Sequence, residues 1–96
     1  MKLWKFYWYC GRMGELSGVF VATEKEVNAV IGQEIDFGEV LGKHSKIAGP
    51  LKPEDVREMA VSYEFIKEFD EVFGSIGYNP LDYIREWEEE ESYEDL

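Results

Sequence analysis

Cysteine and histidine are nearly missing from this sequence, which contains one of each among 96 residues. Because Cys10 has no second cysteine to pair with, no internal disulfide can form, and nothing points to export. Cys10 and His44 share no metal-ligand spacing, so no metal or other cofactor is expected. Lys2 and Lys5 interrupt the first apolar residues, which is not the pattern of a signal peptide. These absences favour a cytoplasmic protein.

Long hydrophobic runs are absent too, and basic residues are scarce. No apolar stretch approaches the roughly 20 residues that span a bilayer. The chain has 10 Lys and Arg against 21 Asp and Glu, a formal net charge of −11. Residues 1–50 hold six basic and six acidic residues, whereas residues 51–96 hold four and fifteen, and 4 − 15 gives the whole −11. Direct binding of nucleic acid or of an anionic membrane requires clustered Lys and Arg, so a basic protein is the expected partner.

Apolar and aromatic residues, by contrast, are plentiful at 45% and 16% of the chain. At this length the chain suits a single domain with a modest core. Its alternating and helical patterns predict an α+β fold: a small antiparallel sheet of three to five strands, a short crossover helix, and two C-terminal helices packed on one face. We expect residues 1–88 to form this domain and residues 89–96 to form an acidic, frayed tail.

The first half of the chain reads mainly as strands. Residues 3–10 alternate so that their apolar side chains fall on both faces, and residues 18–22 resume this pattern after a glycine-interrupted loop, which predicts a hairpin. Aromatic side chains on both faces indicate either a strand covered on both sides or one face left exposed for binding. Residues 33–41 and 45–51 predict a second strand pair, with Pro50 favouring an edge position.

A short helix is expected between these two strand pairs. Thr23 and Glu26 have the spacing of a capping box, in which each side chain bonds the backbone amide of the other residue. Val27, Val30 and Ile31 supply an apolar stripe, and Gly32 suits a left-handed helix end.

Residues 54–62 are ambiguous. They fit one turn followed by a strand, with Ser62 capping the next helix, and they also fit the start of one long helix from Pro53. We favour the strand, because Ser62 is a good cap and the long helix would have 20 residues in so small a domain.

Two helices are expected after Ser62. Residues 63–73 place their apolar side chains at helical spacing on one face, and Gly74 ends the helix. Asn79 and Pro80 are suited to start a second helix, whose apolar stripe stops near Trp87. The predicted apolar stripes consist of Phe65, Ile66, Phe69, Val72 and Phe73 on the first helix, and of Leu81, Ile84 and Trp87 on the second.

Acidic residues repeat along both of these helices. Carboxylates at i, i+4 and i+7 lie roughly 5–6 Å apart and repel, which costs a few tenths of a kcal/mol per pair in an isolated helix. Such an array can serve binding, or it can be a solvated surface with no partner. One stripe alone imitates DNA poorly, because DNA carries a charge every ~1.7 Å along its axis. The candidate partner-binding residues are Glu64, Glu68 and Glu71 on the first helix, and Asp82, Glu86, Trp87, Glu89 and Glu90 on the second.

Two other kinds of function stay open. A small-ligand-binding or catalytic domain could use the glycine-rich segment 11–18 with Arg12, together with His44 in the turn at 42–45. No catalytic residues can be named, since Cys10 is expected to be buried and inert. A homo-oligomeric structural module could form through the aromatic strand at 3–10. We therefore expect a monomer or a homodimer.

In charge and size the chain resembles the small acidic proteins that block basic nucleases and other DNA-handling enzymes, such as immunity proteins and phage-borne DNA mimics. The resemblance implies a non-enzymatic inhibitor or adaptor that engages the basic surface of a nucleic-acid-handling protein. The acidic residues of the two C-terminal helices would carry that contact.

Overall fold

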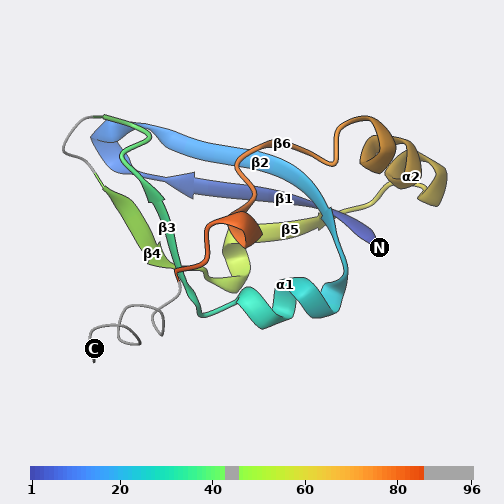
Figure 1. Cartoon of the computed structure of the whole chain (residues 1–96), viewed down its shortest axis with the longest axis horizontal. Coiled ribbons are helices and arrows are strands. Elements are labelled where there is room, and N and C mark those ends of the chain that lie inside the picture. Colours follow the sequence, from blue (N-terminus) through green and yellow to red (C-terminus); the bar gives the residue numbers. More distant parts are fainter. Residues whose placement is uncertain (43–45, 86–96) are drawn as a thin grey trace, which may run out of the picture.

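A computed structural model describes residues 1–42 and 46–85 of the chain (Figure 1). Four strands form an antiparallel sheet in the order β5-β1-β2-β6, and two more form a separate pair, β3-β4. Two helices complete the α+β fold predicted from the sequence. The strands are β1 (Lys2–Tyr9), β2 (Glu15–Ala22), β3 (Glu34–Gly38), β4 (Ile47–Pro50), β5 (Val56–Met59) and β6 (Ser75–Gly77); the helices are α1 (Glu24–Val30) and α2 (Tyr63–Val72).

The β1–β2 hairpin is the centre of the large sheet. Its register runs from Lys2 opposite Ala22 to Tyr9 opposite Glu15, so β2 begins three residues earlier than the sequence suggested. The chain reverses through one 3-10 turn, η1 (Gly11–Met13), and the amide of Cys10 donates to the Gly14 carbonyl at 2.8 Å.

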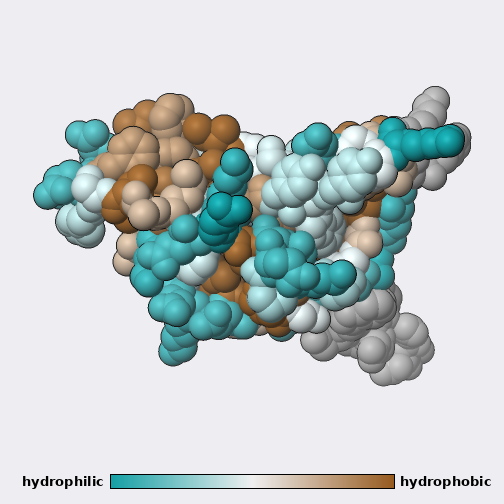
Figure 2. All heavy atoms as spheres, turned by 180° about the vertical axis from the view of Figure 1, so that it is seen from behind, coloured by the Kyte–Doolittle hydropathy of each residue, from teal (hydrophilic) through white to brown (hydrophobic). Residues whose placement is uncertain are grey.

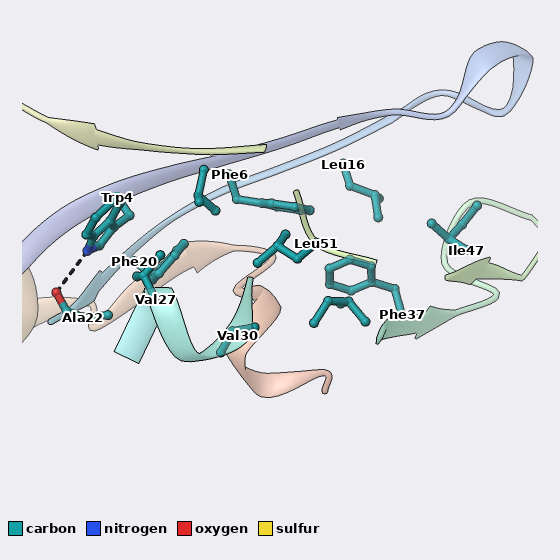
Figure 3. Packing of buried hydrophobic residues seen from close by; sticks show 12 residues of the cluster. Trp4, Phe6, Leu16, Phe20, Ala22, Val27, Val30, Phe37, Ile47 and Leu51 are labelled. Atoms are coloured by element: carbon teal, nitrogen blue, oxygen red, sulfur yellow. Dashed lines mark hydrogen bonds between the residues drawn. The ribbon is translucent and has the colours of Figure 1, made fainter. Parts of the chain in front are cut away.

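One apolar cluster lies between the hairpin and the layer formed by α1 and β3 (Figure 3). Phe6 and Phe20 are fully buried, and the indole of Trp4 donates to the Ala22 carbonyl at 3.0 Å. Phe37 of β3 joins the two sheets, because its ring lies 5.6 Å from Phe6 and 5.4 Å from Trp8. Both sheets and α1 therefore share a single core.

Helix α1 begins as its sequence predicts. The Thr23 hydroxyl accepts from the Glu26 amide at 3.0 Å, and the Glu26 carboxylate accepts from the Thr23 amide at 2.8 Å. Val27 and Val30 enter the core, and Gly32 adopts a φ of 92° where the chain leaves the helix. The capping box thus directs the chain from β2 across the sheet.

The ambiguous segment is resolved in favour of a turn and a strand. Pro53–Asp55 forms the 3-10 turn η2, and β5 then pairs antiparallel with β1 before Ser62 caps α2. The long helix from Pro53 does not form. Strand β5 is instead one edge strand of the large sheet and pairs with Leu3 to Phe6 of β1.

The prediction of a second C-terminal helix is wrong over the described residues. Asn79 does cap a turn, since its side chain accepts from the Leu81 amide at 3.0 Å, but only the 3-10 turn η3 (Pro80–Asp82) follows. Ile84 then makes an antiparallel bridge to Ile35 of β3, and the Tyr83 carbonyl accepts from the Asp36 amide at 3.0 Å. Pairing with β3 therefore replaces helix in this segment, because it satisfies backbone groups at the free edge of β3.

The described residues contain no helix with the length and apolar run needed to cross a bilayer. The expected division into a domain at 1–88 and a tail at 89–96 extends beyond the described residues and stays a prediction.

Candidate protein-binding surface

Helix α2 covers only a small part of the outer face of the sheet. It begins at Ser62, whose hydroxyl accepts from the Phe65 amide at 3.1 Å, and it ends before Gly74, which adopts a φ of 73°. Ile66, 8% exposed, is the one buried residue of the helix. Leu3, on the face of β1 opposite the main cluster, is 2% exposed, and α2 contacts β1 and β2. A single point of apolar packing thus holds the helix to the sheet.

Apart from Ile66 and the half-buried Phe69, the apolar side chains of the predicted face are exposed, against the expectation that they pack together on the sheet. Val72 is 70% exposed, Phe73 59% and Phe65 48%. The rings of Phe65, Phe69 and Phe73 follow one another along the helix, at 6.4 Å and 5.5 Å between centroids. We call Phe65, Phe69, Val72 and Phe73 the aromatic stripe; it forms much of the brown area at the α2 end of the molecule in Figure 2.

The physical reason for this exposure lies in the sheet. The outward positions of β1 and β2 carry Leu3, Val19 and Val21 together with Lys5, Tyr7 and Ser17. The apolar part of this face is therefore interrupted by polar side chains.

The predicted acidic residues of α2 lie beside the aromatic stripe. At about 100° per residue, the aromatic stripe occupies an arc of about 100°, and Glu64, Glu68 and Glu71 occupy a neighbouring arc of about 60°. These three residues, which we call the acidic stripe, are all exposed. None of them belongs to an ion pair with another described residue.

The net charge of α2 is strongly negative. The helix holds Lys67 against Glu64, Glu68, Asp70 and Glu71, and 1 − 4 gives −3 over ten residues. Glu64 in the first turn is favoured by the helix dipole, whereas Glu68 and Glu71 lie beyond that turn and, at this spacing, repulsion among the carboxylates slightly weakens the helix.

Asp82 does not join the acidic stripe. It is exposed on η3, and Figure 1 places η3 near the middle of the molecule while α2 lies at one end of the sheet. The described residues therefore do not form the acidic array shared by two helices that DNA mimicry would require. Glu86, Trp87, Glu89 and Glu90 lie outside the described residues.

Of the residues proposed for a ligand loop, the structure describes Arg12 and not His44. Arg12 is exposed in η1 at the tip of the hairpin, and His44 lies outside the described residues. Half of segment 11–18 belongs to β2, because the loop proper ends at Gly14. Burial raises the pKa of the Cys10 thiol, which disfavours the reactive thiolate.

A groove of about 570 Å³ lies between the end of β1 and β4. Tyr7, Trp8 and Tyr9 contribute to one wall, and the Trp8 indole donates to the Asp55 carboxylate at 2.7 Å. Successive residues of a strand direct their backbone N–H and C=O groups to opposite edges. The Cys10 amide bonds on the β2 side, so the backbone groups of Tyr7 and Tyr9 point to the β5 side of β1. The pairing between β1 and β5 ends at Phe6 opposite Val56, and the groove lies beside the residues of β1 that follow.

Asp36 holds the β3–β4 pair to the following segment. Its carboxylate accepts from Arg85 Nη2 at 2.7 Å and from the Gly38 amide at 3.0 Å, and it lies 3.2 Å from Lys46 Nζ. Partial burial acts to raise the pKa of Asp36, but the hydrogen bonds from Arg85, Lys46 and Gly38 outweigh it, so the pKa lies below its ordinary value of 3.8. The Asp36 carboxylate thus connects β3 to Lys46, just before β4, and to Arg85.

Within the described part of the chain, no three acidic, histidine or cysteine side chains are arranged to hold a metal ion. Comparison with known protein families, curated proteins and solved structures finds no match to the chain. The function must therefore be argued from the surface of α2 and from the groove.

Proposed function

We propose that this chain is a non-enzymatic binding module, an inhibitor or adaptor that engages the basic surface of a nucleic-acid-handling protein. The observation that carries this proposal is the acidic stripe of α2, whose carboxylates are exposed, lack ion pairs within the described residues and border exposed aromatic rings. Acidic groups provide attraction and selectivity toward a basic partner, and aromatic side chains provide the buried anchor.

An immunity-protein mode suits this surface better than DNA mimicry. Phosphate imitation needs negative charge spread over a long track, whereas α2 offers one short stripe and Asp82 lies apart from it. An acidic stripe beside apolar anchors suits a compact protein interface, in which charge surrounds a desolvated centre. A cytoplasmic location and the absence of direct nucleic-acid binding belong to the same proposal.

The proposal is tested by pull-down over a salt series with charge-matched variants. Neutralising Glu64, Glu68 and Glu71 to Gln changes the formal charge from −11 to −8, and a control with Glu15, Glu39 and Glu54 changed to Gln has the same charge. A basic partner should be retained by the wild type and the control at low salt, released by high salt, and lost by the α2 variant. A partner retained equally at high salt, or lost equally by both variants, contradicts the proposal.

A small-ligand site in the groove is the second candidate function. Its volume of about 570 Å³ falls in the usual range of ligand pockets, and Tyr7, Trp8 and Tyr9 give its walls aromatic rings. Ala48 is exposed in the groove, so Ala48→Arg should fill it. NMR screening with small aromatic molecules should shift amide signals of β4 in the wild type and not in this variant. If no compound shifts them, the groove has no such role.

A further inference from the structure

The aromatic stripe of α2 has no partner within the described part of the chain. Phe65, Val72 and Phe73 are exposed while Phe69 is half-buried, and Ile76 of the strand that follows α2 is 49% exposed. Figure 2 shows an apolar area at the α2 end of the molecule. Contiguous exposed apolar groups on a small protein mark a surface that another molecule covers.

We infer that the aromatic stripe binds an amphipathic α-helix of the partner, whose apolar face is edged by Lys or Arg. This inference rests on the proposed function and specifies the form of the partner at the same surface. Phe65 and Phe73 would insert into the apolar face of that helix, while Glu64, Glu68 and Glu71 pair with its basic edge.

The spacing of the rings favours a helical partner. Phe65, Phe69 and Phe73 stand at i, i+4 and i+8, so they form one ridge with successive residues about 6 Å apart along the axis. A second helix offers matching grooves between its own i and i+4 rows, and an amphipathic helix binds through anchors at such intervals. An extended strand repeats its side chains on one face about every 6.8 Å but offers a narrow row without those grooves.

Charge decides between a foreign helix and a second copy of the chain. On one side the aromatic stripe meets the protein at Ile66, and on the other it meets the acidic stripe. Two copies would bring together helices of net charge −3 on molecules of net charge −11, which repel. A helix with a basic edge turns the same carboxylates into attraction, so charge complementarity selects it.

The test uses two synthetic peptides of identical leucine and lysine composition. In the helix-patterned peptide the leucines recur every three or four residues, and in the strand-patterned peptide they alternate with lysine. Titration calorimetry gives the affinity, and ¹⁵N NMR shifts on the full chain locate the contact. We expect the helix-patterned peptide to bind roughly tenfold more tightly and to shift signals of α2.

Matched variants separate the aromatic contribution from that of charge. Phe65→Ser and Phe73→Ser should each weaken the helix-patterned peptide by roughly tenfold, as expected for anchor residues. Tyr9→Ser, at a ring that is 73% exposed elsewhere, should leave binding unchanged. Circular dichroism of each variant checks that the fold is retained, which the exposure of all three rings favours.

The outcomes distinguish this inference from the proposed function. Equal, salt-sensitive binding of both peptides that depends on Glu64, Glu68 and Glu71 would overturn the helical partner and leave the acidic binding module standing. If neither peptide binds at α2, both fail. If the chain self-associates through Phe73 and binds neither peptide, the inference of a foreign helix is overturned and a second copy of the chain is the occupant of this surface.

Discussion

Single residues join parts of this fold that lie far apart in the sequence. Asp36 bonds Arg85, 49 residues away, and also pairs with Lys46. Its spacing in the sequence carries no sign of this role, because 21 acidic residues offer too many possible pairs. The side chains of Asp36 and Arg85 are 21% and 25% exposed, so their contact is partly shielded from solvent.

Replacing Asp36 with Asn should destabilise the protein by about 1 kcal/mol at neutral pH, because Arg85 and Lys46 lose a charged partner. The folded-state pKa of Asp36 is lowered, so its contribution is present above the unfolded value and is lost as pH falls through the folded one. Urea unfolding from pH 7 downward should show the two proteins converging below a pH of about 4. A difference that stays constant with pH contradicts this role.

Gly18 allows an unusually close approach between two chain segments. A Cβ added there would lie 2.1 Å from the Tyr78 carbonyl oxygen and 2.6 Å from the Tyr78 nitrogen, both backbone atoms. Gly18→Ala should therefore separate β2 from β6 and cost about 2 kcal/mol or more, the scale of overpacking.

Gly49→Ala is the matched control, since a Cβ at Gly49 meets nothing within 4 Å. It should be neutral or slightly stabilising in the same chemical denaturation experiment. Equal effects of the two substitutions would show that crowding at Tyr78 is not what requires glycine at position 18.

At the scale of elements, capping residues in the sequence predicted where a helix or turn begins. They did not predict how long it is or which other element it packs against. Thr23, Ser62 and Asn79 all cap the turns that follow them. A cap is a contact between near neighbours, so sequence alone can specify it. It cannot specify length: Asn79 starts one 3-10 turn, because the open edge of β3 competes for the residues beyond it.

The apolar face of α2 shows the same limit for the candidate site. Spacing predicted correctly that Glu64, Glu68 and Glu71 lie along one helix, and that the apolar residues share another face. Exposure of that face depends on how much apolar area the sheet offers, which the pairing of β1, β2 and β5 determines. Asp82 was predicted as a binding residue on a second helix, but its segment forms only a 3-10 turn.

Ser62→Ala should loosen α2 without unfolding the sheet. Loss of this cap should cost about 1 kcal/mol. Because Ile66 is the one buried residue of α2 and Phe69 is only half-buried, the cost should appear as local opening of the helix. Hydrogen exchange of amides in α2 should accelerate while amides of β1 and β2 keep their protection. Equal acceleration in the central strands would mean that α2 and the sheet unfold as one unit.

At the scale of the whole molecule, charge and apolar exposure oppose each other. The net charge of −11 keeps copies apart, while the aromatic stripe favours contact between them. We expect a monomer at low ionic strength and weak self-association at high salt, where repulsion is screened.

Sedimentation velocity over a salt series checks this balance. Changing Phe65 and Phe73 to Ser should abolish the association at high salt, whereas Tyr9→Ser should preserve it. A dimer that persists at low salt, or one that survives loss of both rings, would point instead to an interface through the aromatic strand β1.

The most direct measurement of the central claim is hydrogen–deuterium exchange of the chain with and without the basic partner that it captures. The account predicts slower exchange across residues 63–73, because the partner covers both stripes of α2. Protection confined to the groove between β1 and β4, with α2 exchanging as fast as in the free protein, would contradict it.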